Sequence, residues 1–185
     1  MHSKTPVYWH TFIHPTFQNR PLYLATTTQG LCRITWPTES LETLQSWVEK
    51  RIPHARLIED PIPLANATSQ LQEYFAGTRQ SFSIPVDLRG TSFQTAVWNA
   101  LAAIPYGETR SYSDIASDIG NGQAVRAVGT ANGANPVPII IPCHRVIGKN
   151  TTLTGFRGGL QVKETLLQLE GNHHYINQGH ARFQF

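Results

Sequence analysis

The segment from Asn135 to Val146 constrains this chain most, because prolines interrupt an apolar run that leads directly to a cysteine. The three prolines stiffen the approach to Cys143, since each holds its own backbone angle φ. The apolar residues between them should be buried. A cysteine at the end of a rigid, buried segment is held in one position. That placement benefits a nucleophile, because fixed geometry can remove several kcal/mol from a reaction barrier.

The composition of the 185-residue chain excludes several classes of protein. Hydrophobic residues make up 40% and charged residues 15%, which argues against both a disordered chain and a highly charged coiled coil. No apolar run approaches the roughly 18–20 residues of a membrane-spanning helix. Residues 1–6 also lack the apolar core of a signal peptide. We therefore expect a cytoplasmic protein with no membrane partner.

Cysteine and histidine spacing gives no sign of a disulfide framework or a metal centre. The two cysteines, Cys32 and Cys143, are too few for a disulfide scaffold. The adjacent pair His173-His174 is poorly spaced for a metal, and neither a CxxC nor an HExxH motif occurs. We expect reduced cysteines, no metal site and no cofactor.

The first half of the chain has the pattern of a small α/β unit. Residues 22–27 and 31–36 are strand-like, and Gln29-Gly30 between them indicates a hairpin. Two helices and a short edge strand should follow: Thr38 (as the cap) to Val48, Asn66 (as the cap) to Gly77, and Ser81 to Pro85.

The second half has a helical pattern. Apolar residues recur at helical spacing from Phe93 to Ile104, and Pro105 ends that helix. A capping-box-like start at Ser111 opens a short helix, and a second short helix should cover residues 123–133. Because a glycine-containing turn joins them, the pair indicates a helix-turn-helix-like unit.

A linker-like stretch at residues 85–91 separates these halves. The expected fold is α/β, with an N-terminal domain of a small antiparallel sheet and helices at 1–88. A mostly helical domain with a helix-turn-helix should follow at 89–185.

Charge is distributed unevenly. Residues 1–88 carry seven basic and seven acidic side chains, whereas residues 119–157 carry four cations and no acid. The cations are Arg126, Arg145, Lys149 and Arg157. Such a stretch is a candidate phosphate-facing surface, although a merely solvated surface explains it about as well. The small residues beside Arg126 fit either tight internal packing or close approach to a nucleic-acid groove.

Cys143 needs a partner to act as a nucleophile, because the thiolate is the reactive form and a free cysteine has a pKa near ~8.5. His144 is next in sequence. In an extended segment adjacent side chains point to opposite faces, so a bridging water is more plausible than direct contact. An orienting carboxylate could come from Glu164 or Glu170. An inert buried thiol beside a core histidine remains an equal alternative.

Ile-Pro-Cys-His-Arg-Val at 141–146 resembles the active-site signature of the O6-alkylguanine-DNA alkyltransferases, the methylated-DNA–protein-cysteine methyltransferases. The resemblance covers residues 92–171 closely and the N-terminal half loosely. Further matching motifs occur in the family's order: Phe93-Gln94, Val97-Trp98, Pro105 to Thr109, Ser111-Tyr112, Ala127 to Gly129, Asn135-Pro136, Gly158-Gly159, Lys163-Glu164 and Leu166 to Gly171.

The resemblance implies an irreversible, single-turnover repair protein. Cys143 would accept an alkyl group from the O6 oxygen of guanine and, as in many members, from the O4 oxygen of thymine. His144 would act as a base through a water, with Glu170 orienting it. Tyr112 would donate toward the guanine ring nitrogen as negative charge develops there.

The resemblance also implies double-stranded DNA containing alkylated guanine or thymine as the partner, and we expect a monomer. The damaged nucleotide must leave the stack, and Arg126 matches the family's arginine finger, which fills the gap. Positions that match DNA-backbone contacts are Tyr112, Ser113, Asn121 and Lys149. Other positions match the base pocket and its support. Asn135 would hold a turn, and the carbonyls of Cys143 and Val146 would accept from the guanine amino group. Arg157 would lie beside the pocket mouth.

Two positions depart from the common pattern: Phe156 stands where tyrosine is common, and Arg157 stands where many members have a small residue. Three rival classes fit less well. Relatives that bind alkylated bases without transfer have another residue at the cysteine position. A sequence-specific regulator needs polar base-reading side chains on its second helix. A cysteine hydrolase needs a better dyad than adjacent Cys143 and His144.

Overall fold

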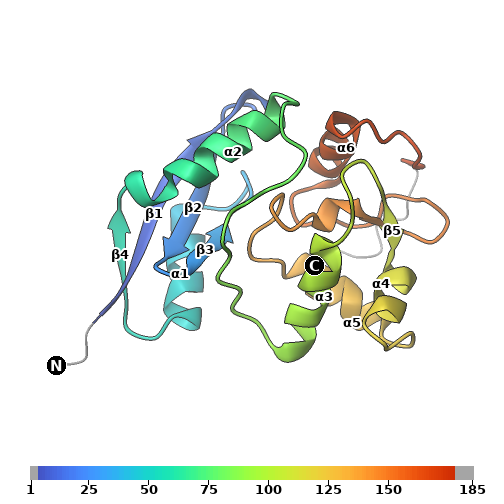
Figure 1. Cartoon of the computed structure of the whole chain (residues 1–185), viewed down its shortest axis with the longest axis horizontal. Coiled ribbons are helices and arrows are strands. Elements are labelled where there is room, and N and C mark those ends of the chain that lie inside the picture. Colours follow the sequence, from blue (N-terminus) through green and yellow to red (C-terminus); the bar gives the residue numbers. More distant parts are fainter. Residues whose placement is uncertain (1–3, 178–185) are drawn as a thin grey trace. The chain divides into compact units, whose positions relative to one another are not determined.

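The computed structural model describes residues 4–177, which belong to two compact units that divide between Arg89 and Gly90 (Figure 1). Each unit has its own core, and we describe each by itself. In the described residues, no helix is long and apolar enough to cross a membrane.

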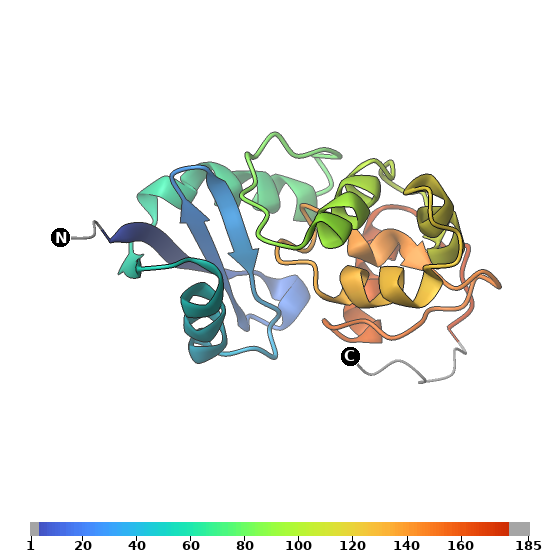
Figure 2. The same ribbon diagram turned by 90° about the horizontal axis from the view of Figure 1, so that it is seen from below.

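The N-terminal unit is built on one four-stranded sheet with the order β3-β2-β1-β4. β1 pairs antiparallel with β2 and parallel with β4. Figures 1 and 2 show the two α-helices on opposite faces of this sheet. The elements are β1 (Thr5–Ile13), η1 (Pro15–Phe17), β2 (Pro21–Thr27), β3 (Gly30–Ile34), α1 (Leu41–Arg51), β4 (Ala55–Glu59), η2 (Ile62–Leu64) and α2 (Ala65–Phe75).

The hairpin predicted around Gln29-Gly30 is confirmed as the turn between β2 and β3. Both predicted helix caps are wrong. α1 begins after Ser40 rather than Thr38, and Asn66 lies inside α2, where its Oδ1 accepts from Gln70 Nε2 (2.9 Å). α2 starts early because a 3₁₀ turn leads directly into it.

The predicted edge strand at residues 81–85 is also wrong, because these residues form no strand and only Val86, directly after them, makes an isolated bridge to Leu31 of β3. The backbone amide of Leu31 donates to the Pro85 carbonyl (2.8 Å), and the backbone amide of Asp87 donates to the Leu31 carbonyl (2.9 Å). Pro85 has no amide hydrogen to extend the ladder. The start of the stretch expected to be a linker at residues 85–91 therefore covers the edge of β3.

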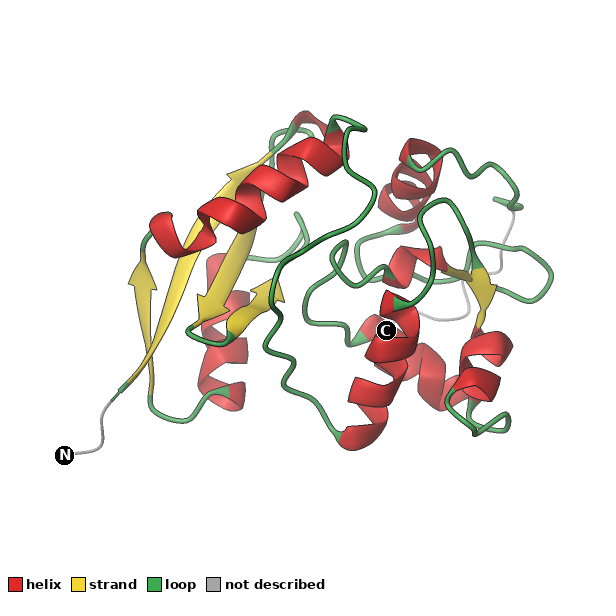
Figure 3. Cartoon of the chain, in the orientation of Figure 1, coloured by secondary structure: helices red, strands yellow, loops and turns green. Residues whose placement is uncertain are grey.

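Short helices and loops make up most of the C-terminal unit (Figure 3). α3 begins with a capping box between Thr91 and Gln94, and α4 begins with one between Ser111 and Asp114, the second as predicted. Trp98 on α3 donates to the Ala131 carbonyl on α5 (2.8 Å), which holds these helices together. The elements are α3 (Ser92–Ala102), β5 (Arg110–Ser111), α4 (Tyr112–Asp118), α5 (Val125–Gly133), η3 (Cys143–Arg145), β6 (Val146–Ile147) and α6 (Leu160–Leu169).

Candidate active site

The proline-rich segment that leads to Cys143 is buried, as its apolar residues predict. Asn135 bridges its two ends: Nδ2 donates to the Ile141 carbonyl (2.7 Å), and Oδ1 accepts from the Val137 amide (3.0 Å). Ile139 adopts a φ of 75°, which a branched side chain rarely tolerates. The Asn135 bonds and the surrounding packing thus hold the cysteine's support in one shape.

Cys143 opens a single 3₁₀ turn, so the expectation of an extended segment at Cys143 and His144 is wrong. The Arg145 amide closes the turn on the Pro142 carbonyl (3.0 Å). Successive side chains of a 3₁₀ helix are rotated by about 120°, since it has three residues per turn. Cys143, His144 and Arg145 therefore project in three directions, and all three are buried.

His144 and Arg145 meet on one carboxylate, that of Glu170 at the end of α6. His144 Nε2 lies 2.7 Å from Oε1, while Arg145 donates through Nε to Oε2 (2.8 Å) and through Nη2 to Oε1 (2.9 Å). The His144 and Glu170 side chains are 0% exposed. The other carboxylate considered, Glu164, instead accepts from Tyr175 and Asn177.

The electrostatics of this triad decide where its protons lie. Burial by itself would raise the pKa of Glu170, but the hydrogen bonds and charges of His144 and Arg145 outweigh it and hold the pKa below its ordinary value. Burial lowers the pKa of His144, and the opposing influence of Glu170 does not restore it. The carboxylate is therefore ionised and the imidazole neutral, with its proton on Nε2. His144 Nδ1 is left as an acceptor and has no hydrogen-bond partner in the described residues.

Arg145 does not belong to a phosphate-facing surface, which corrects the expectation for the acid-free stretch. Its guanidinium is buried and also donates through Nη1 to the Ile104 carbonyl (2.6 Å). Glu170, which neutralises it, lies outside that stretch of sequence. Arg126, Lys149 and Arg157 are exposed, so three of the four cations are available to solvent.

Burial raises the pKa of the Cys143 thiol to about 11, although the Asn135 hydrogen bond and the Lys163 charge oppose the rise. The resting side chain is therefore a thiol that needs a base. Lys163, which has no expected role in the sequence pattern, is fully buried, and its Nζ donates to the Val146 carbonyl (2.6 Å). The sequence feature that could have indicated its burial is its spacing, since Lys163 lies three residues before Leu166 and therefore on the same buried face of α6.

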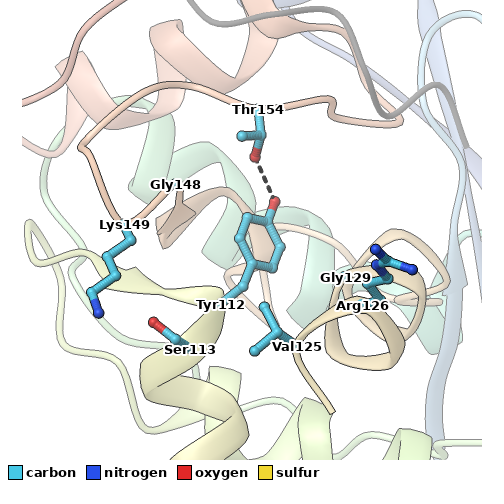
Figure 4. A pocket seen from close by; sticks show the side chains of 8 residues that line it. All are labelled: Tyr112, Ser113, Val125, Arg126, Gly129, Gly148, Lys149 and Thr154. Atoms are coloured by element: carbon cyan, nitrogen blue, oxygen red, sulfur yellow. Dashed lines mark hydrogen bonds between the residues drawn. The ribbon is translucent and has the colours of Figure 1, made fainter. Parts of the chain in front are cut away.

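Tyr112, the first residue of α4, carries the second set of contacts. Thr154 Oγ1 donates to the Tyr112 hydroxyl at 2.9 Å, which leaves the tyrosine proton free to be donated elsewhere (Figure 4). Burial raises the pKa of Tyr112, the Thr154 bond opposes the rise, and the charge of Cys143 adds to it. The phenol therefore stays protonated, and it lies within electrostatic range of Cys143.

A pocket of about 310 Å³ opens beside Tyr112. Figure 4 draws Arg126 and Lys149 on either side of the tyrosine ring. The remaining lining residues are Ser113, Val125, Gly129, Gly148 and Thr154. Four of the residues predicted from the resemblance, Tyr112, Ser113, Arg126 and Lys149, thus share one pocket. Asn121 lies in the exposed turn between α4 and α5.

The small residues of α5 fit both explanations that the sequence left open, namely tight internal packing and close approach to a nucleic-acid groove. Ala131 is buried and accepts the Trp98 bond, so it packs inside the unit. Ala127 is exposed and Gly129 lines the pocket, so these two leave room on the outer face beside Arg126.

Two family models match the chain over most of its length. The model described as 6-O-methylguanine DNA methyltransferase, DNA binding domain, matches residues 92–172, and the corresponding ribonuclease-like domain matches residues 15–88. The chain belongs to the 6-O-methylguanine DNA methyltransferase family. The N-terminal half, which resembles the family only loosely by motif, thus has its own match within the family.

Relatives and solved structures agree with that assignment. The inducible methylated-DNA–protein-cysteine methyltransferase of Bacillus subtilis is 48% identical over 168 residues, which cover 91% of this chain and 92% of the relative. The crystal structure of Mycobacterium tuberculosis O6-methylguanine methyltransferase has a TM-score of 0.76 at 44% identity, covering 89% of this chain and 92% of that one. A structure of the M. tuberculosis protein in complex with DNA has a TM-score of 0.74 at 44% identity, covering 88% and 92%.

Proposed function

We propose that this protein repairs alkylated DNA by moving the alkyl group from the O6 oxygen of guanine to Sγ of Cys143, once per molecule. The observation that carries the proposal is the buried hydrogen bond between Glu170 and His144, the residue directly after a rigidly held cysteine. Family membership supports the reaction class. We extend the proposal to the O4 oxygen of thymine, because the same carbon–oxygen bond is broken there.

In the transfer, a carbon–sulfur bond forms as the carbon–oxygen bond of the lesion breaks. The thiol proton must leave first, since burial holds the pKa of Cys143 at about 11. His144 Nδ1 is the natural acceptor: it is unprotonated, buried and without a partner in the described residues. We propose that the proton reaches it through one water. The thioether product is stable, so the protein is consumed.

Glu170 keeps His144 ready for this step. Its carboxylate fixes the proton on Nε2, directs Nδ1 away from itself and stabilises the imidazolium that forms. Arg145 acts on His144 only through Glu170, as a positioning residue, because its two hydrogen bonds orient the Glu170 carboxylate and keep it ionised.

The guanine ring leaves with extra electron density, so a proton donor lowers the barrier. Tyr112 supplies that proton in our proposal, and Thr154 acts as the residue that positions it. Because Thr154 donates to the phenol oxygen, the tyrosine proton is directed elsewhere. The Val146 carbonyl, proposed to accept from the guanine amino group, already accepts from Lys163 but keeps a second lone pair.

The exposed face of α4 and α5 is the proposed DNA surface. Arg126 would replace the extruded base in the stack, while Ser113, Asn121 and Lys149 would contact the backbone. Open space at Ala127 and Gly129 permits close approach to a narrow groove. Arg157 is exposed three residues before Leu160, the first residue of α6, and we propose that it borders the mouth of the base pocket there.

We propose an N-terminal α/β domain at residues 1–88 and a DNA-binding, methyl-acceptor domain at residues 89–185. The division of contacts between Arg89 and Gly90 supports this boundary. We also propose that the protein acts as a cytoplasmic monomer, and sedimentation velocity with and without duplex DNA tests the oligomeric state.

Intact-mass spectrometry after mixing with duplex DNA containing O6-methylguanine tests the function. We expect one added methyl group, mapped to Cys143, and no further turnover. Cys143→Ala should gain no methyl group and leave the lesion intact while still binding DNA. Cys32→Ala is the matched control, because Cys32 is buried in the sheet of the other unit and should not affect transfer. Transfer by Cys143→Ala, or methylation of Cys32 instead, would refute the proposal.

A further inference from the structure

The chain contains two Asn-Gly pairs, and the fold places them in opposite environments. Asn121-Gly122 lies in the exposed turn between α4 and α5. Asn132-Gly133 closes α5, where the Asn132 side chain is buried. The same dipeptide therefore occurs once on the surface and once in the core of one unit.

Asn-Gly is the dipeptide most prone to spontaneous deamidation, because glycine offers no side chain to hinder ring closure. The backbone nitrogen of the glycine attacks the side-chain amide carbon of the asparagine. A carbon–nitrogen bond forms, ammonia leaves, and water then opens the cyclic imide to aspartate or isoaspartate. The reaction consumes only water, but it needs a free backbone amide and room for the ring.

The turn at Asn121 meets both needs. The backbone amide of Asn121 donates to the Ala116 carbonyl, and the Asn121 carbonyl accepts from the Ala124 amide, each at 2.9 Å. The turn is therefore anchored on either side. Between those anchors, the Gly122 amide and the Asn121 side chain make no hydrogen bond with the residues that the structure describes. A carbon added at Gly122 would meet nothing nearer than the Ser117 hydroxyl at 3.8 Å.

The other asparagines of this region lack these features. Gly133 is the last residue of α5, and its amide is committed to the helix. Asn135 precedes Pro136, which has no amide hydrogen, and both oxygen and nitrogen of its side chain are bonded. We infer that Asn121 is a deamidation site, and that its conversion places a carboxylate on the surface between the two helices.

The consequence of this conversion rests on the proposed function. A carboxylate at Asn121 would face phosphate, replacing a neutral donor with a repelling charge. Isoaspartate would also lengthen the backbone of the turn and disturb the spacing of α4 and α5. Deamidated molecules should therefore bind duplex DNA several-fold more weakly than fresh protein.

Peptide mapping of the full-length protein, incubated in mildly alkaline buffer, tests the site. A synthetic peptide of residues 118–125 serves as the unstructured reference. We expect Asn121 to convert at a rate close to that of the peptide, and Asn132 to remain an amide. Gly122→Ala should greatly slow conversion without disturbing the fold, because the space beside Gly122 is open. An intact Asn121 after the peptide has converted, or equal conversion of Asn132, would overturn the inference.

The effect of deamidation on DNA binding is measured separately, by comparing the duplex affinity of the Asn121→Asp variant with that of fresh wild type. A several-fold loss supports the effect on binding. If Asn121 deamidates but Asn121→Asp binds duplex as tightly as wild type, the modification site stands and the DNA contact assigned to Asn121 is wrong. Failure of fresh wild type to bind duplex at all would instead refute the proposed function.

Discussion

Arg145 donates to both oxygens of the Glu170 carboxylate, although the two residues are 25 positions apart in the sequence. His144 shares one of those oxygens. An arginine that sequence reasoning assigned to a phosphate-facing stretch therefore belongs to the interior, where it sets the charge and orientation of the residue that serves the proposed base.

Glu170→Gln should slow alkyl transfer by on the order of 10²-fold, the usual share of a general base. The neutral amide stabilises an imidazolium less well, and it fixes the His144 proton on Nε2 less firmly because one of its two ends can only donate. Single-turnover rates with duplex O6-methylguanine measure the effect. Glu164→Gln on the same helix is the matched control and should react like wild type. Equal rates in the two variants would remove Glu170 from the mechanism.

Arg145→Met should lower the free energy of unfolding by about 3–5 kcal/mol, because it leaves the Glu170 carboxylate buried without its guanidinium. Urea unfolding of the single variant and of Arg145→Met with Glu170→Gln measures the loss. The double variant should recover part of it, since no unpaired charge remains. A double variant as unstable as the sum of both single changes would contradict this account.

The acid dependence of stability should change in the same variant. The pKa of Glu170 is depressed in the folded protein, so its ionised form stabilises the fold above the unfolded pKa of about 4.3 and that stabilisation is lost as pH falls further. Without Arg145 the depression is smaller. Urea unfolding from neutral pH downward should therefore show a shallower loss of stability for Arg145→Met than for wild type.

Thr154→Val should slow transfer to duplex DNA several-fold, because the phenol of Tyr112 loses the donor that directs its proton. Thr154→Ser keeps the hydroxyl and should restore the rate. The pH profile of the rate distinguishes positioning from packing: valine should shift its alkaline limb, since Thr154 lowers the pKa of Tyr112. Identical profiles and rates for valine and serine would show that the hydroxyl has no role.

Arg126→Ala should slow repair of duplex O6-methylguanine but leave the reaction with the free alkylated base nearly unchanged. The free base needs no extrusion, whereas a paired base costs a few kcal/mol to flip. The ratio of single-turnover rates at saturating substrate isolates that step. Lys149→Ala, at the opposite side of the pocket, should weaken binding of all DNA substrates instead. An unchanged ratio would remove Arg126 from base flipping.

Duplex affinity should fall with salt along a shallow slope. Three cations of the acid-free stretch are exposed and Arg145 is buried. Because Arg126 and Arg157 have other proposed roles, not all three need neutralise phosphate, and the slope of log K against log salt should be no steeper than about −3, at roughly −0.9 per neutralised phosphate. Titrations over a range of salt concentrations measure it. A salt-independent affinity would exclude this surface.

Local structural features could be predicted from the sequence because residues close together in the chain create them. The capping box at Ser111, the glycine-bounded turn between α4 and α5, and the rigid approach to Cys143 each depend on residues within a few positions of one another. The motif around Cys143 was specific enough to indicate the family, which the comparisons confirm.

Contacts between distant segments were decided by the tertiary structure alone. Burial of Arg145 depends on Glu170 from another helix, and the buried Lys163 depends on the Val146 carbonyl, 17 residues away. The Thr154–Tyr112 bond spans 42 residues. Charge patterns and propensities describe a residue and its neighbours, whereas burying a charge becomes favourable only when the fold supplies a partner. The sequence alone therefore predicted Cys143 as the candidate nucleophile and the helices around it, and packing determined which charged side chains lie buried beside it.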